Sequence, residues 1–131
     1  VDSTLWWLHV EQPGAFWANQ STTSHARVIS GAVDGLRSMG VLAGIYATAL
    51  QWGEITGNQL SFPNIPEWVP GAGNISGGSL SAQSFCAGTT GLPNDYAPFA
   101  GGKIVLVQYG YGGNGYTGPP SSYDQDYACP Q

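Results

Sequence analysis

The sequence predicts an α/β fold with about four parallel strands, two or three helices, and long loops rich in Gly, Ser and Pro. Three consecutive segments carry this prediction. The apolar run from Leu5 to Val10 is short and is stopped by Pro13-Gly14, which is typical of a buried strand. An amphipathic segment follows it, and then a second apolar run from Val41 to Ala47. Apolar strands on both sides of an amphipathic helix favour a parallel strand–helix–strand unit.

The helix between these strands is expected from about Ser24 to Met39. Ser21 to Ser24 offer side chains that cap a helix N-terminus, and Gly40 supplies the C-terminal stop. Apolar residues recur at spacings of three and four and form one stripe, namely Ala26, Val28, Ile29, Ala32, Val33, Leu36 and Met39. Such a stripe indicates a helix that packs one face against a sheet.

The rest of the chain continues the alternation of helix and strand. The expected elements are a shorter helix from Ala49 to Ile55 ended by Gly57, a weak strand from Glu67 to Val69, a short helix near Cys86 within a loop from Gly71 to Gly102, a strong strand from Lys103 to Tyr109, and a final segment from Tyr123 to Cys129. Periodicity alone leaves two architectures open, an open doubly wound sheet and part of a barrel.

Composition excludes several classes of function. With 3 basic and 8 acidic residues the net charge is −5, which does not suit a nucleic-acid-binding protein. Apolar runs stop well short of the ~20 residues that cross a bilayer. Residues 1–10 lack the basic region of a signal peptide. Charged residues make up only 8% of the chain, and an uncharged polar surface of this kind is common in secreted proteins.

Cys86 and Cys129 are the only cysteines. An even count in a chain of extracellular character favours one disulfide, worth roughly 3 to 4 kcal/mol in the chain-entropy model. The alternative is two buried free thiols. A zinc site is disfavoured because His9 and His25 lack ligand spacing to the cysteines. We therefore expect neither a metal nor another cofactor.

His9 and Glu11 lie two residues apart at the carboxyl end of the first strand, so their side chains share a face. In parallel α/β folds this end carries ligands and catalytic groups. Tryptophans flank Glu11 and would partly desolvate it, a setting that suits a general acid. The alternative is a carboxylate that caps or pairs with a nearby loop.

A second acidic pair, Asp124 and Asp126, follows the last strong strand. These carboxylates and Glu11 could face each other across a barrel mouth, as glycoside hydrolysis requires. They could equally bind a cation or lie solvated in a turn. Aromatic residues gather near the same strand ends, where rings stack on sugars or simply pack; those expected to bind substrate, together with Asp126, are Trp7, Tyr46, Trp68 and Tyr109.

Six short motifs follow one another along the chain: Leu5–Glu11, Gly44-Ile45-Tyr46, Trp52, Trp68-Val69, Val107-Gln108-Tyr109 and Asp124–Tyr127. In this order they resemble the second half of a family 25 glycoside hydrolase, and more closely the glycoside-hydrolase-like domains of secreted actinobacterial proteins. The resemblance implies a single domain over residues 1–131, the carboxy-terminal half of a (β/α)8 TIM-like barrel. It also implies a secreted muramidase-like hydrolase that acts on peptidoglycan in the cell wall.

Carried over by position, Glu11 matches the glutamate of the family motif, the expected general acid, and Asp124 matches a late aspartate. His9 stands where the family has another aspartate, and a histidine does not supply the same negative charge to an oxocarbenium ion. Two alternatives therefore accompany the hydrolase: an inactive glycan-binding module, and a self-assembling extracellular structural protein. A full barrel needs ~200 residues or more, so we expect a missing amino-terminal half or self-association to cover the open sheet edges.

Overall fold

The computed structural model describes residues 4–12, 16–70, 82–88, 97–109 and 125–131. These segments contain five strands and three helices, in the order β1 (Leu5–His9), α1 (Thr22–Ser38), β2 (Leu42–Tyr46), α2 (Ala49–Thr56), β3 (Pro66–Val69), α3 (Ala82–Cys86), β4 (Lys103–Tyr109) and β5 (Gln125–Ala128). The predicted alternation of strands and helices is confirmed.

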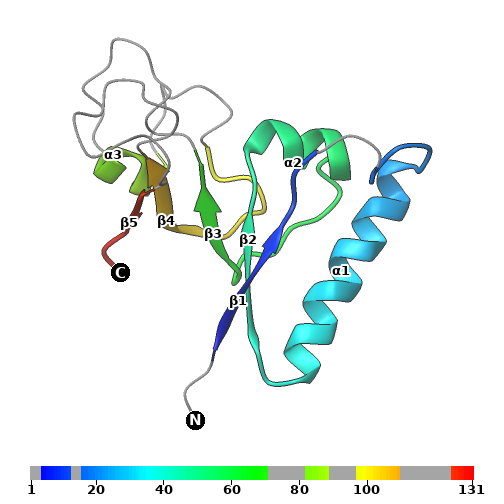
Figure 1. Cartoon of the computed structure of the whole chain (residues 1–131), viewed down its shortest axis with the longest axis horizontal. Helices are drawn as coiled ribbons and strands as arrows, with labels where there is room; N and C mark the ends of the chain where they lie inside the picture. The colour runs from blue at the N-terminus through cyan, green and yellow to red at the C-terminus, as the bar shows by residue number, and fades with distance from the viewer. Residues whose placement is uncertain (1–3, 13–15, 71–81, 89–96, 110–124) are drawn as a thin grey trace.

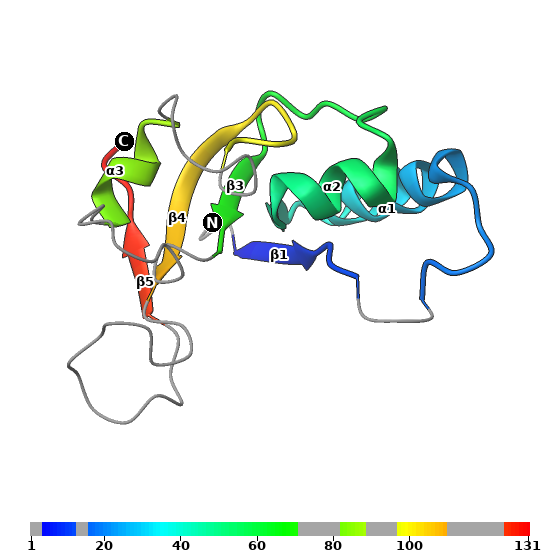
Figure 2. The same ribbon diagram turned by 90° about the horizontal axis from the view of Figure 1, so that it is seen from above.

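The strands form one sheet in the order β1-β2-β3-β4-β5. β1 to β4 pair in parallel, whereas β5 pairs antiparallel to β4. Each strand therefore lies beside the next one in sequence, without the reversal of strand order that marks a doubly wound sheet. The sheet curves, with the helices on its outer side (Figures 1 and 2). This mixed α/β arrangement is consistent with part of a (β/α)-barrel.

Local capping signals fix the start of both longer helices and the end of α2. Ser21 precedes α1, and its hydroxyl accepts a hydrogen bond of 3.2 Å from the backbone N–H of Ser24. α1 thus begins two residues before the predicted start at Ser24. Thr48 caps α2 in the same way through the N–H of Gln51, at 3.0 Å. Gly57 ends α2 with φ of 62°, a left-handed conformation that glycine adopts without strain.

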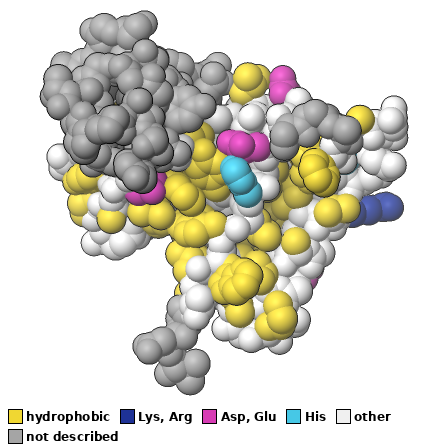
Figure 3. All heavy atoms as spheres, in the orientation of Figure 1, with side chains coloured by type: hydrophobic (Ala, Val, Ile, Leu, Met, Phe, Trp, Pro, Cys, Tyr) yellow, Lys and Arg dark blue, Asp and Glu magenta, His cyan; other side chains and the backbone are white. Residues whose placement is uncertain are grey.

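The two faces of the sheet differ sharply. Alternate residues of β1 and β2 point toward α1 and α2, where a buried apolar core gathers: Val10, Ile29, Val33, Ala43, Ile45, Ala47, Trp52, Ile55, Ile65 and Ala100. Trp7, His9 and Tyr46 alternate with these residues and so lie on the opposite face. We call this opposite side the open face of the sheet. Figure 3 looks onto it and shows a broad apolar area with acidic and histidine side chains together near its upper part.

A second apolar cluster lies between α3 and the last two strands. It contains Val69, Phe85, Ile104, Val107 and Cys129. The predicted disulfide is present between Cys86 and Cys129, with an S–S distance of 2.05 Å and 43 residues of sequence separation. It links α3 to the end of β5 and so fastens the short helix to the sheet.

Glu67 is a fully buried carboxylate on β3, with 0% of the residue exposed. Its oxygens accept three backbone hydrogen bonds from the segment before β4, from the N–H groups of Phe99 at 2.9 Å, Ala100 at 3.0 Å and Gly102 at 2.7 Å. Three donors satisfy most of the lone pairs of an ionised carboxylate. Glu67 therefore fixes the entry into β4.

Three features bear on the remaining predictions. The final strand is antiparallel, so the sheet holds the expected four parallel strands and one more. No helix within the described ranges is long and apolar enough to cross a membrane. In the same part of the chain, no three His, Cys, Asp or Glu side chains cluster as metal ligands do.

Candidate active site

The side chains of His9 and Glu11 contact each other at the carboxyl end of β1, and this contact is an ion pair when His9 is protonated. Nε2 of His9 lies 3.1 Å from Oε2 of Glu11. The His9 side chain is 63% exposed and that of Glu11 is 33% exposed. The structure thus brings together the two side chains that the sequence places on one face. Both are accessible enough to meet a ligand, and Glu11 is the more desolvated of the two.

Trp17 braces the backbone at Glu11. Its indole Nε1 donates a hydrogen bond of 2.8 Å to the backbone carbonyl oxygen of Glu11. The Trp17 ring also packs edge-on against His25 of α1, with the ring centroids 4.8 Å apart. The segment that follows β1 is in this way tied to the first turn of α1.

A row of aromatic rings crosses the open face from His9. The ring of His9 lies edge-on to Tyr46 on β2 at 4.5 Å, and Tyr46 lies edge-on to Trp68 on β3 at 4.7 Å. Trp7 contacts Trp68 at 5.5 Å. These separations are typical of edge-to-face aromatic pairs. Three of the residues predicted to bind substrate, Trp7, Tyr46 and Trp68, therefore share one surface beside the ion pair.

Gly44 makes room for Trp7 in this row. The two residues are direct partners in the register of β1 and β2. A Cβ atom at position 44 would lie 2.5 Å from Cε3 and from Cζ3 of the Trp7 ring. The indole ring therefore rests against the backbone of Gly44, and a larger residue there would push it away.

Gln108 extends the surface onto β4. The hydroxyl of Tyr46 donates a hydrogen bond of 2.9 Å to Oε1 of Gln108. Gln108 pairs directly with Asp126 of β5, and directly opposed residues in an antiparallel pair point to the same face. The exposed Asp126 thus belongs to the open face. Glu67, which sequence reasoning did not single out, is buried on the opposite face and saturated by backbone donors.

The structure describes one of the predicted site residues only in its backbone and another not at all. Tyr109 is the last residue of β4, at the same edge of the sheet as His9, and its side chain is not described. Asp124 lies outside the described residues. The structure consequently places one of the two predicted catalytic carboxylates.

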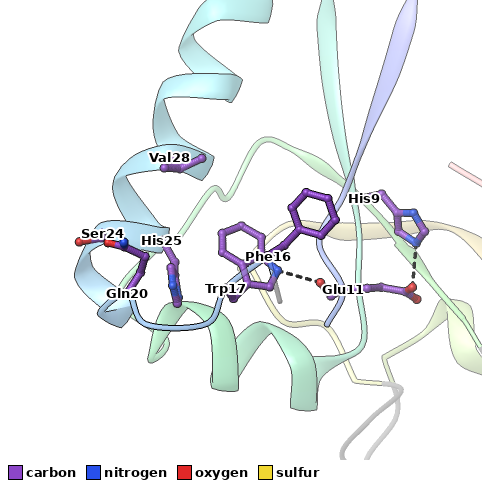
Figure 4. Close-up of a pocket in the computed structure, with 8 residues that line it drawn as sticks. All are labelled: His9, Glu11, Phe16, Trp17, Gln20, Ser24, His25 and Val28. Atoms are coloured by element: carbon purple, nitrogen blue, oxygen red, sulfur yellow. Dashed lines mark hydrogen bonds and ion pairs between the residues drawn. The ribbon is translucent and has the colours of Figure 1, made fainter. Parts of the chain in front are cut away.

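A pocket of about 490 Å³ opens beside Glu11 on the α1 side. Figure 4 shows α1 along one side of it, with Phe16, Trp17 and His9 across from the helix; the lining residues are His9, Glu11, Phe16, Trp17, Gln20, Ser24, His25 and Val28. Most of them were not recognised in the sequence as site residues. In the sequence, Ser24, His25 and Val28 fit the start of an amphipathic helix. Apart from His9 and Glu11, only Trp17, as an aromatic residue that flanks Glu11, pointed to a site here.

A protein-family model described as Lysozyme-like protein 1 matches residues 1–85. The match covers well over half of the 131 residues. The chain belongs to the lysozyme-like protein 1 family. Comparison with curated proteins gave no match, and comparison with solved structures gave none.

The part of this lysozyme-like chain that matches its family runs from β1 into α3. It contains the His9–Glu11 pair, Tyr46 and Trp68, as well as the whole of the pocket. It ends before β4, so Gln108, Asp124 and Asp126 lie beyond it. The more specific resemblance to family 25 glycoside hydrolases remains a prediction.

Proposed function

We propose that this lysozyme-like chain is a muramidase-like glycan hydrolase in which Glu11 is the general acid. The observation that carries the proposal is the His9–Glu11 pair at the carboxyl end of β1, next to a row of aromatic rings and within the residues that match the family. Parallel α/β folds present their catalytic groups at this end of the strands.

Glu11 has the features of an acid in glycosidic bond cleavage. Its side chain is one-third exposed, so a sugar oxygen can approach it, while Trp17 anchors its backbone. In the proposed step the carboxyl proton passes to the glycosidic oxygen as the bond to the anomeric carbon breaks. An ionised Glu11 paired with a protonated His9 holds no proton to give. Catalysis therefore requires either that the substrate separate the pair, or that the substrate bind while the proton is on Glu11.

A second carboxylate is needed to assist the departure of the sugar or to activate water. Asp124 has this role in the proposal by its position in the resemblance, and Asp126 is a proposed substrate ligand on the open face. Glu67 is unsuited to it, because it has no exposed surface and its oxygens already accept three backbone hydrogen bonds.

The open face supplies the sugar-binding surface of the proposal. Trp7, Tyr46 and Trp68 present rings in one row, and the exposed Asp126 can accept hydrogen bonds from hydroxyl groups. A neutral surface with flat rings and few charges suits an uncharged polysaccharide backbone. Tyr109 at the end of β4 stays a predicted substrate-binding residue.

His9 favours a second candidate, a glycan-binding module without turnover. In the resemblance it occupies the place of a family aspartate, and it contacts the Oε2 atom of Glu11 at 3.1 Å, so the site lacks a negative charge where the family has one. The aromatic surface would then hold a glycan chain that is not cut.

One experiment separates the two candidates. The wild-type protein and His9→Asp are each incubated with purified peptidoglycan, release of reducing ends is measured, and thermal unfolding is followed with and without soluble glycan. The hydrolase predicts release by the wild type and faster release by His9→Asp. An inert wild type that glycan still protects from unfolding would refute the hydrolase and support the binding module.

Location and assembly complete the proposal. An extracellular site is supported by the Cys86–Cys129 disulfide, because such bonds persist in oxidising compartments. A single domain over residues 1–131, with its open sheet edges covered by self-association or by a further barrel segment, is supported by the barrel-like strand order. A mass measurement in solution tests self-association, and a strict monomer would remove it.

A further inference from the structure

We infer that the pocket between α1 and the segment after β1 is a subsite for an uncharged sugar ring, in which Nε2 of His25 accepts a hydrogen bond from a hydroxyl or amide group of the ligand. The inference rests on the proposed function, because it adds a binding position to the glycan site at Glu11. The pocket of about 490 Å³ falls within the range of small-molecule sites, ~300 to 1,000 Å³.

The hydrogen bonding of His25 fixes which of its nitrogens carries a proton. Nδ1 lies 2.9 Å from the backbone carbonyl oxygen of Ile55 in α2. A carbonyl oxygen only accepts, so Nδ1 is the protonated nitrogen, and Nε2 of the neutral ring is an acceptor. His25 is 6% exposed, and Nε2 has no hydrogen-bond partner among the described residues.

An unpaired buried acceptor costs free energy that a donor from a ligand recovers. The His25 ring lines the pocket, but Nε2 itself is covered. A ligand therefore has to shift part of the wall, and Trp17, which packs edge-on against the His25 ring, is the neighbour that this shift moves. Trp17 also donates a hydrogen bond to the backbone carbonyl oxygen of Glu11. Occupation of the pocket therefore changes the position of Glu11.

The remaining walls select the chemistry of the ligand. Phe16, Trp17 and Val28 offer apolar surface, and Gln20 and Ser24 offer neutral hydrogen-bonding groups. Among the described residues that line the pocket there is no lysine or arginine, so no side chain offers an opposite charge to an anion. An uncharged ring with hydroxyl or acetamido groups fits these walls, whereas a sugar that carries a carboxylate does not.

The test uses nitrogen-15 NMR of the intact protein with the Glu11→Gln substitution, which prevents cleavage, titrated with triacetylchitotriose. We expect saturable shifts of the His25 Nε2 and Trp17 indole resonances, and a weaker response to N-acetylmuramic acid. Shifts confined to residues of the open face, or an equal response to the acidic sugar, would overturn the inference. Hydrolysis by the wild type is measured separately, so loss of turnover with these shifts intact refutes the proposed function alone.

Two substitutions at position 25 test the role of Nε2. Asparagine can keep a donor toward the Ile55 carbonyl oxygen but removes the distal acceptor, so His25→Asn should weaken binding about fivefold, the size of one hydrogen bond. His25→Gln, which can place an oxygen near Nε2, should retain more affinity. Phe16→Ala provides a variant without a folding risk, because Phe16 is 85% exposed, and should also weaken binding. Unchanged affinity in His25→Asn and in Phe16→Ala would contradict the subsite.

Discussion

The indole N–H of Trp17 donates a 2.8 Å hydrogen bond to the backbone carbonyl oxygen of Glu11. This contact joins the segment after β1 to the residue that we place at the centre of catalysis. It also holds the backbone at a residue that lies beyond the end of the strand.

Trp17→Phe removes this hydrogen bond while keeping an aromatic ring against His25. We expect the free energy of unfolding to fall by about 0.5 to 1.5 kcal/mol, the net value of one hydrogen bond, and glycan turnover to fall because Glu11 is less well fixed. Urea unfolding and an activity assay measure the two effects. Trp6→Phe is the matched control, since Trp6 is 59% exposed. Equal effects of the two substitutions would mean that the brace has no special role.

Gly44→Ala should displace the Trp7 ring from the aromatic row. The added methyl group would lie 2.5 Å from two ring carbons, so the ring must move. We expect destabilisation of about 1 to 3 kcal/mol, the usual cost of overpacking. Thermal unfolding measures it. Gly31→Ala in α1 is the control, because a Cβ there meets nothing within 4 Å and should be neutral or stabilising.

Glu67→Gln should destabilise the protein because one carboxylate oxygen becomes an amide donor facing backbone N–H groups. At least one buried N–H loses its acceptor, which costs about 1 to 3 kcal/mol. The exposed Glu54→Gln on α2 should stay within about 0.5 kcal/mol of the wild type. A stability for Glu67→Gln as high as for Glu54→Gln would show that the three hydrogen bonds add nothing.

Reduction of the Cys86–Cys129 disulfide should lower stability by roughly 3 to 4 kcal/mol, because the unfolded chain regains the freedom of a loop with 43 residues of separation. Chemical denaturation of the oxidised protein and of the Cys86→Ser, Cys129→Ser double variant measures the difference. Comparable midpoints would contradict a stabilising role for this bond.

Much of the fold follows from signals that are local in sequence. Ser21, Thr48 and Gly57 mark helix ends within one turn, and the apolar run from Lys103 to Tyr109 becomes β4 with the predicted bounds. The direction of β5 could not be read in this way, because it depends on pairing with β4 rather than on a local pattern. The order of the strands could not be predicted locally either, because it depends on which strands pair in the folded sheet.

The candidate site was predictable only in part, for a similar reason. His9 and Glu11 are two residues apart, so the alternation of a strand brings them together. The pocket instead requires α1 and the segment after β1 to meet. The sequence also does not show that Ile55 of α2 is the hydrogen-bond partner of His25. From the sequence, Glu67 could be a surface carboxylate. Its three backbone hydrogen-bond donors lie more than 30 residues away along the chain, so no local pattern shows that it is buried.

The most direct test of the catalytic account is the rate at which wild-type protein and Glu11→Gln release reducing ends from purified peptidoglycan. Glutamine keeps the size of the side chain but cannot donate a proton as a carboxylic acid does. We predict turnover by the wild type and a loss of about 10²- to 10⁴-fold in Glu11→Gln, the usual contribution of a general acid, with unfolding unchanged. Equal rates for the two proteins, or no turnover by either, would contradict the assignment of Glu11 as the catalytic acid.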